Sequence, residues 1–66
     1  MRIELNGRPH ELLEGTTVAG MITSVTGSAH GSAAVVDGEV VPRSAWSDVA
    51  LREGQSVELI TAVQGG

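Results

Sequence analysis

The amino-acid sequence predicts an α+β fold in which one helix packs against one face of a mixed sheet. Two short glycine turns and one apolar stripe carry this prediction. The pairs Asn-Gly at 6–7 and Asp-Gly at 37–38 are typical of two-residue hairpin turns. An apolar stripe with helical spacing lies between them, and an alternating segment follows the second pair. The predicted order is therefore two strands, a helix, two strands and a last strand.

The first hairpin begins almost at the first residue. Ile3 and Leu5 alternate with polar residues, which is the pattern of a half-buried strand. After the Asn-Gly turn, residues 8–13 would form the returning strand. Pro9 cannot donate a ladder hydrogen bond, so we expect this strand at an edge of the sheet.

The helix is expected after Gly15, which ends the returning strand. Thr16 or Thr17 can cap it, because a threonine hydroxyl accepts a hydrogen bond from a free N–H of the first turn. Gly27 stands where a C-terminal cap belongs. The stripe that this helix would bury has the spacing i, i+3, i+4 and i+7 and consists of Val18, Met21, Ile22 and Val25.

The second hairpin joins residues 33–36 to residues 39–41, and Pro42 ends it. We expect Ser44 to cap a single turn that carries Ala45 and Trp46, with Trp46 filling the core. Leu51 would fill the core from the irregular segment that follows. A Glu-Gly pair at 53–54 then turns the chain into the last strand.

The last strand is predicted over residues 56–62. Val57 and Leu59 lie on one face of it, and Glu58 and Ile60 lie on the other. A right-handed crossover would place this strand beside the first one and parallel to it, in the middle of the sheet. This is the ubiquitin-like β-grasp arrangement. It gives a domain over residues 1–62 with a four- to five-stranded sheet, and a flexible C-terminal tail over residues 63–66.

Composition excludes several classes of function. The chain has 66 residues, a net charge of −4 and no cysteine. A negative charge argues against binding to nucleic acid phosphates, and no apolar run is long enough to span a membrane. The absence of cysteine and of a signal-peptide pattern fits a reducing cytoplasm. Two separated histidines cannot supply a closed zinc site, so no metal is expected.

No group of side chains suggests catalysis. There is no cysteine, and no serine is spaced with a histidine and a carboxylate as in a nucleophilic site. His10, in an edge strand, and His30, in a loop, are expected to be solvated. The remaining candidate is the pair Gly65-Gly66, which would arise by chance in about one sequence in two hundred. A carboxylate flanked by residues without Cβ can enter a narrow channel.

The Gly66 carboxylate is ionised at neutral pH and can attack the α-phosphate of ATP to give an acyl adenylate. A sulfur nucleophile can then displace AMP and leave a C-terminal thiocarboxylate. The chain contains four arginines and no lysine. Compositional bias explains this more simply than selection does. An activated C-terminus would nevertheless meet no side-chain amine on its own chain.

The sequence resembles the bacterial ThiS-type sulfur carriers of thiazole biosynthesis. The resemblance covers nearly the whole chain, over residues 3–7, 17–18, 36–46, 51–54 and 57–66. Its narrowest parts are a Val-Pro-Arg-Ser-x-Trp segment and an Ala-Val-Gln-Gly-Gly end. The departures are mild, such as Asp37 where the family often has Asn and Gln55 where it often has Asp.

The resemblance implies a relay in which this chain is a protein cosubstrate and not an enzyme. A ThiF-like adenylyltransferase would activate Gly66 with ATP and magnesium, and the carrier itself would bind no cofactor. A cysteine desulfurase would supply persulfide sulfur, and thiazole synthase would accept it. The residues that would thread into these enzymes are Val63, Gln64, Gly65 and Gly66.

Two alternatives remain open from the sequence. One keeps the chemistry but changes the client, as in a MoaD-type carrier for molybdopterin or for another sulfur pathway. The other is a non-covalent β-grasp interaction module in which the terminal glycines are incidental.

For partner contact, Glu58 and Ile60 with Arg43 nearby are candidates. The competing interpretation is that Ile60 is core and Arg43 only extends its stem over it.

Overall fold

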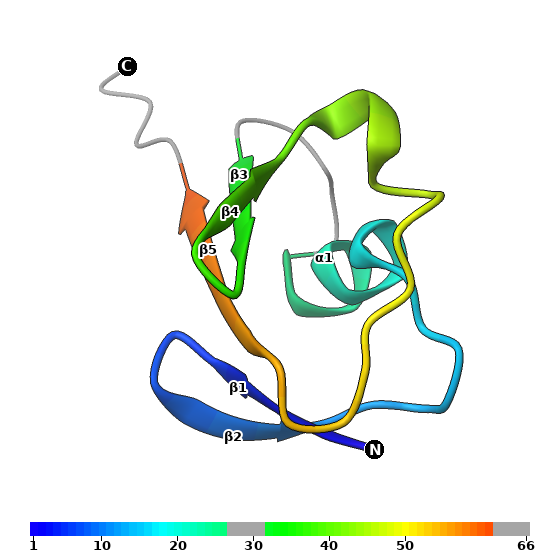
Figure 1. Ribbon diagram of the computed structural model, residues 1–66, viewed down its shortest axis with the longest axis vertical. Helices are drawn as coiled ribbons and strands as arrows, with labels where there is room; N and C mark the ends of the chain where they lie inside the picture. The colour runs from blue at the N-terminus through cyan, green and yellow to red at the C-terminus, as the bar shows by residue number, and fades with distance from the viewer. Residues whose placement is uncertain (27–31, 62–66) are drawn as a thin grey trace.

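The computed structural model describes residues 1–26 and 32–61. The described residues form a five-stranded sheet with an α-helix on one side of it (Figure 1). A short 3-10 helix follows the fourth strand. The elements are β1 (Arg2–Leu5), β2 (Arg8–Glu11), α1 (Val18–Thr26), β3 (Ser32–Val36), β4 (Glu39–Val41), η1 (Arg43–Ala45) and β5 (Ser56–Thr61).

The strand order is β2-β1-β5-β3-β4. β5 lies in the middle and runs parallel to β1, whereas the other neighbouring strands are antiparallel. This confirms the predicted β-grasp fold. It also confirms the edge position of the strand that contains Pro9, because β2 ends the sheet.

Both hairpin turns have the backbone that their sequences predict. Asn6 and Asp37 have φ of 51° and 49°, and the glycines that follow have φ of 82° and 85°. Positive φ at both central residues defines a type I′ turn, whose twist matches that of the flanking strands. Asn and Asp tolerate this left-handed conformation better than other residues with a side chain. The turn chemistry therefore sets the register of both hairpins.

The core lies between α1 and the face of the sheet that α1 covers. Val18, Met21 and Ile22 are buried as predicted, but Val25 is 42% exposed. The predicted stripe is therefore wrong at its last position, because the core stops one turn before α1 ends. The buried hydrophobic residues are Ile3, Leu5, Val18, Met21, Ile22, Ala34, Val36, Trp46, Leu51, Val57 and Leu59.

The segment between β4 and β5 confirms two predictions and corrects one. Trp46 and Leu51 are buried. Ser44 does not cap the turn, because η1 begins one residue earlier and Pro42 occupies the N-cap position without a side-chain cap. The Ala45 N–H donates to the Pro42 carbonyl at 2.8 Å, so the backbone itself closes this turn.

Some strand ends differ from the prediction. The returning strand ends at Glu11 and not at residue 13. Leu12 still exchanges hydrogen bonds with Met1, and a turn follows in which the Leu13 carbonyl accepts from both the N–H and the hydroxyl of Thr16. β3 begins one residue before the predicted start. The described part of β5 ends at Thr61, and the predicted domain boundary after residue 62 lies outside the described residues.

Candidate functional site: the central strand and the outer face

The predicted reactive residue follows β5 in the chain. Gly66 and the residues that lead to it, Val63, Gln64 and Gly65, lie outside the described residues. The structure describes the strand that precedes them. How β5 is held, and what surrounds it, is therefore the geometry that bears on the predicted site.

β5 pairs with a strand on each side, but the pairing is longer on one side than on the other. β3 pairs with it from Val36↔Val57 to Ser32↔Thr61. β1 pairs with it only at Glu4↔Ser56 and Leu5↔Val57. The last main-chain hydrogen bond from this side runs from the Asn6 N–H to the Val57 carbonyl, at 2.9 Å. Beyond Val57, the chain that follows β1 turns away into the first hairpin.

The Asn6 side chain continues the contact where β1 ends. Its Oδ1 accepts from the Leu59 N–H at 2.8 Å, and its Nδ2 donates to the Leu59 carbonyl at 3.4 Å. One side-chain amide thus pairs with both main-chain groups of Leu59. The same residue makes the type I′ turn, so a turn residue also binds the central strand.

Asp37 binds the beginning of β5 in a similar way. Its Oδ1 accepts from the Ser56 N–H at 2.9 Å, and its Oδ2 accepts from Gln55 Nε2 at 3.2 Å. The Asp37 N–H also donates to the Ser56 carbonyl at 2.7 Å. The first residue of each hairpin turn therefore fixes one part of β5. Sequence reasoning interpreted both residues only as turn formers.

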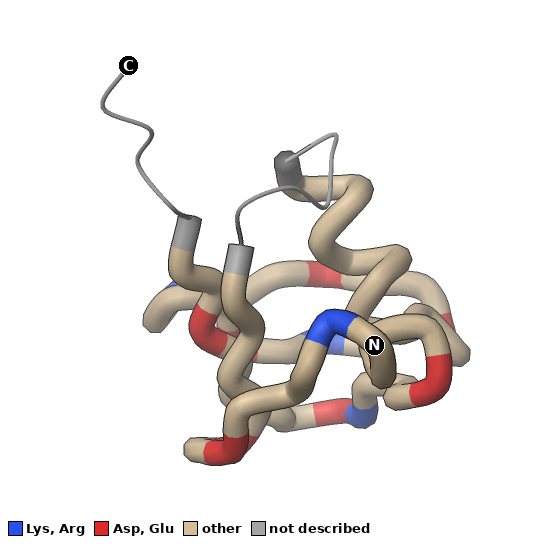
Figure 2. Tube along the Cα trace, turned by 90° about the horizontal axis from the view of Figure 1, so that it is seen from above, with Lys and Arg blue, Asp and Glu red and all other residues tan. Residues whose placement is uncertain are grey.

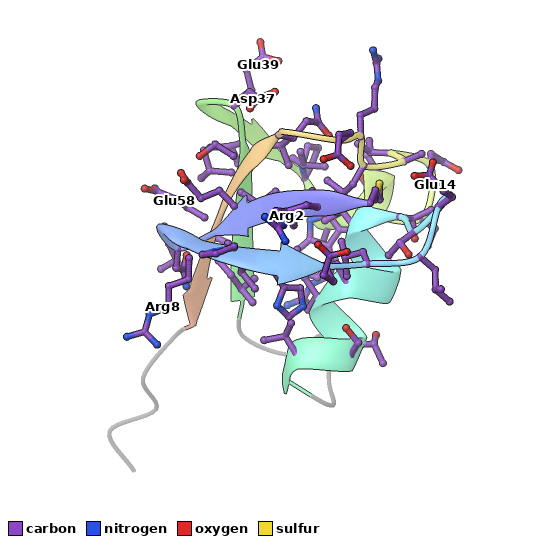
Figure 3. All side chains as sticks on the ribbon, turned by 90° about the horizontal axis from the view of Figure 1, so that it is seen from below. Arg2, Arg8, Glu14, Asp37, Glu39 and Glu58 are labelled. Atoms are coloured by element: carbon purple, nitrogen blue, oxygen red, sulfur yellow. The ribbon has the colours of Figure 1, made fainter. Side chains whose placement is uncertain are left out.

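Among the described residues, no helix or strand covers the sheet face opposite α1, and we call it the outer face. Glu58 and Ile60 both lie there, as the alternation with buried Val57 and Leu59 predicts, and Ile60 is 56% exposed. The interpretation of Ile60 as core is therefore wrong. Figure 3 shows Glu58 projecting from β5 on the side away from α1.

An outer apolar patch surrounds Ile60 on three neighbouring strands. Ala33 on β3 pairs with Ile60, and Val35 on β3 pairs with both Glu58 and Val40. Val40 on β4 is 70% exposed. The patch consists of Ala33, Val35, Val40 and Ile60, with Glu58 among them. Val40 and Ile60 are exposed and Ala33 and Val35 are half-buried, and adjoining apolar groups at the surface of a small protein are typical of an interaction surface.

The part of the outer face on β1 and β2 is charged instead. Arg2 and Glu11 are opposite each other, and their Nε and Oε2 atoms lie 2.9 Å apart. Glu4 is exposed on the same face. Acidic positions are spread around the described chain in Figure 2. The outer apolar patch is therefore bordered by charge, mostly negative.

Arg43 lies elsewhere in the fold. It begins η1, which follows β4, and β3 separates β4 from β5. Its guanidinium carbon lies 5.6 Å from the centroid of the Trp46 ring, a distance typical of a cation–π contact. The structure thus joins Arg43 to Trp46, and its role in partner binding stays a prediction.

The described residues show no candidate metal site. They contain no group of three or more His, Cys, Asp and Glu side chains that could hold a metal ion. None of their polar or charged residues is buried. His10 is half-buried opposite Ile3, and His30 lies outside the described residues. No helix in the described part of the chain is long and apolar enough to cross a membrane.

A mixed sheet with parallel first and last strands, one covered face and one open face defines a small ubiquitin-like β-grasp protein. The ThiS family model matches residues 3–66. The chain therefore belongs to the ThiS family, in agreement with the resemblance noted in the sequence. Members of this family are small sulfur carriers of thiamin biosynthesis and not catalysts.

Solved structures and a curated relative agree with this assignment. The crystal structure of the thiamine biosynthesis protein ThiS from Geobacter metallireducens is 25% identical, with a TM-score of 0.84 and 100% of both chains covered. A solution structure of a thiamine biosynthesis protein from the same organism has a TM-score of 0.83. At 23% identity, and with 100% of this chain and 88% of that chain covered, it shows the fold alone.

The curated relative is a thiazole synthase of Magnetococcus marinus. It is 32% identical over 66 residues, which are 100% of this chain and 20% of that protein. The chain therefore spans about a fifth of the length of this relative.

Proposed function

We propose that this chain carries sulfur as a thiocarboxylate on Gly66 and delivers it for thiazole formation in thiamin biosynthesis. The observation that carries the proposal is the strand that precedes the tail in the chain. A central strand, held on both sides, leads in sequence directly to the Gly-Gly pair, and the ThiS family match extends through Gly66. A tail that follows this strand would begin next to the outer face.

The proposed chemistry has three steps. A carboxylate oxygen of Gly66 attacks the α-phosphorus of ATP, bound with magnesium to a ThiF-like adenylyltransferase, and pyrophosphate leaves. A persulfide sulfur from a cysteine desulfurase then attacks the acyl carbon, and AMP leaves. A thiol cleaves the resulting acyl disulfide, which leaves the thiocarboxylate on the carrier and a disulfide on the donor. Pyrophosphate and AMP are both stable leaving groups, so the free energy of ATP drives the replacement of one carboxylate oxygen of Gly66 by sulfur.

Thiazole synthase is the proposed acceptor of the sulfur. A segment similar to this whole chain is part of a protein described as thiazole synthase. This favours the thiazole client over a molybdopterin client, for which no comparable observation exists among these relatives. We place the relay in the cytoplasm, because a chain without cysteine fits a reducing compartment.

The outer apolar patch is the proposed docking surface for the enzymes of the relay. It adjoins the strand that leads to Gly66, because Ile60 lies on β5 itself. Glu58 and the acidic surroundings fit a partner with an apolar centre and basic residues at its rim. Docking here would fix β5 on the enzyme and leave residues 63–66 to reach the active site.

The proposal is tested by intact-mass measurement after incubation with ATP, magnesium, the ThiF-like enzyme, a cysteine desulfurase and cysteine. We expect the mass increase that corresponds to one oxygen replaced by one sulfur, located on the C-terminal peptide. Removal of Gly66 should abolish the increase, and Gly66→Ala, which keeps a carboxylate but adds a Cβ, should reduce it strongly. Full conversion of the chain without Gly66 would exclude this residue as the carrier site.

The same variants separate a carrier from a non-covalent interaction module. A module would bind its partner equally well without Gly65 and Gly66 and would show no mass increase. A carrier without these residues keeps its fold and the outer patch, but it cannot be adenylated. The mass measurement on the full chain therefore distinguishes the two functions, and calorimetric binding of the truncated chain shows whether partner binding needs the terminal glycines.

A further inference from the structure

The two sides of β5 are supported unequally toward its end. β3 accompanies β5 through Thr61, but the register with β1 stops at Val57. On the β1 side, Leu59 is bound by the side chain of Asn6 and not by a strand. This side-chain amide is thus the last described support on that side before the chain continues to its C-terminal residues.

Leu59 requires a particular chemistry from its partner. It presents an N–H and a carbonyl to the same side chain, so the partner needs one acceptor and one donor. The partner residue, at position 6, must also adopt a φ of 51°, which Asn tolerates well. Asp offers only acceptors when ionised, and Gly offers no side chain. Asn satisfies both the turn and the strand.

Asp37 binds the beginning of β5 through its side chain as well, but only by accepting hydrogen bonds. Its two carboxylate oxygens meet two donors, the Ser56 N–H and the Gln55 amide. An acceptor-only side chain suits this position, and its φ of 49° makes the same kind of turn. The two turn residues are therefore alike in backbone and position in the hairpin, but they hold different parts of one strand.

We propose that Asn6 is a positioning residue that holds the end of β5 in the sheet and so sets the direction in which residues 62–66 leave it. This role rests on the proposed function. Without the Asn6 side chain, the end of β5 would gain conformational freedom that an enzyme must remove on binding. The cost would appear in the KM for the carrier, because the enzyme itself aligns the carboxylate once the tail is bound.

The test compares Asn6→Gly with Asp37→Gly. Both substitutions keep a residue that accepts positive φ, and each removes one side-chain clamp on β5. Steady-state adenylation by the ThiF-like enzyme is measured with the carrier concentration varied, alongside the free energy of unfolding. We expect Asn6→Gly to raise KM about two- to tenfold with kcat unchanged, the range of one or two hydrogen bonds. Asp37→Gly should lower stability comparably but leave KM near the wild-type value.

Amide hydrogen exchange gives a readout that does not depend on the enzyme. Asn6→Gly should accelerate exchange at Leu59, whereas Asp37→Gly should accelerate it at Ser56. Asn6→Asp serves as the second variant, since it keeps the acceptor for the Leu59 N–H and loses the donor. Its KM should lie between those of the wild type and Asn6→Gly.

Three results would overturn the positioning role. Equal increases in KM for both glycine variants would show a general loosening of β5, and an unchanged KM for Asn6→Gly would show a purely structural residue. If the wild-type chain is not adenylated, the proposed function fails and the positioning role fails with it. In that case exchange at Leu59 still decides whether Asn6 holds the strand.

Discussion

Trp46 shows how much of this small fold depends on one residue. It is the only residue among Trp, Tyr and Phe in the chain, and it is buried. Its indole N–H donates to the Val41 carbonyl at 2.8 Å, and its own carbonyl accepts from the Ala19 N–H at 3.1 Å. The Arg43 guanidinium lies over its ring. Trp46 therefore connects β4, η1 and α1, and a core without other aromatic rings depends on its volume.

Trp46→Phe is expected to lower the free energy of unfolding by about 2–4 kcal/mol. The substitution leaves the Val41 carbonyl without its donor and leaves unfilled volume in the core. Urea unfolding followed by circular dichroism measures the change without relying on tryptophan fluorescence. Arg43→Ala is the control, because it removes an exposed cation–π contact worth about 0.5–1 kcal/mol. An equal loss for both variants would mean that the buried indole contributes no more than the contact above it.

At the scale of the elements, α1 is a short helix that the rest of the fold stabilises. It has nine residues, and Gly20 and the two β-branched threonines, Thr23 and Thr26, weaken its intrinsic propensity. Its first free N–H groups nevertheless have acceptors. Val18 donates to the Val49 carbonyl at 2.9 Å and Gly20 donates to Thr17 Oγ1 at 3.1 Å. Thr17, one of the two threonines that the sequence offered, is thus the N-cap, and carbonyls of the segment before β5 accept from other N–H groups of the first turn.

Gly20→Ala should stabilise the protein by about 0.5–1 kcal/mol. A Cβ at this position would lie 3.5 Å from Thr16 Cγ2 and 3.5 Å from Thr17 Oγ1, which is ordinary contact. The gain comes from helix propensity and is measured by thermal or urea unfolding. Thr17→Ala, which removes the N-cap, should cost about 1 kcal/mol. A destabilised Gly20→Ala would show that the helix backbone needs glycine here for a reason beyond space.

The elements that the sequence predicts well are those fixed by neighbouring residues. The type I′ turns follow from Asn-Gly and Asp-Gly, and β4 follows from the apolar run that Pro42 ends. The errors arise where distant contacts decide. Val25 has the helical spacing of a core residue, but the core does not extend that far. Ser44 has the chemistry of a cap, but the backbone closes that turn from Pro42.

At the scale of the whole molecule, the sheet separates a covered face from an open one. α1 covers one face (Figure 1), and the outer face carries the apolar patch. Alternation along β5 places Ile60 opposite Leu59, but it cannot tell whether a second layer covers that face. The hydrogen bonds between the Asn6 side chain and Leu59 could not be predicted from the sequence either, because the two residues are 53 positions apart. The Gly-Gly pair was recognisable because its chemistry needs no tertiary context.

The outer patch yields the last prediction, which compares Ile60→Ser with Leu13→Ser. Both side chains are large, apolar and exposed, at 56% and 84%, but Leu13 lies between β2 and α1 and not on the outer face. Neither substitution opens the core, so each should change the free energy of unfolding by less than about 0.5 kcal/mol. If the enzymes dock on the outer patch, Ile60→Ser removes apolar area that binding would bury and should raise Kd for the ThiF-like enzyme about tenfold.

Leu13→Ser should leave that Kd unchanged, since its side chain would stay in water in the complex. Isothermal titration calorimetry measures both affinities, and urea unfolding confirms that both variants are folded. Val40→Ser, on the same patch but on the edge strand β4, should weaken binding less if contact centres on β5. Equal weakening by Ile60→Ser and Leu13→Ser would indicate a nonspecific effect of lost hydrophobicity. A wild-type Kd for Ile60→Ser would place docking elsewhere on the molecule, so the tail and not the sheet would then determine recognition.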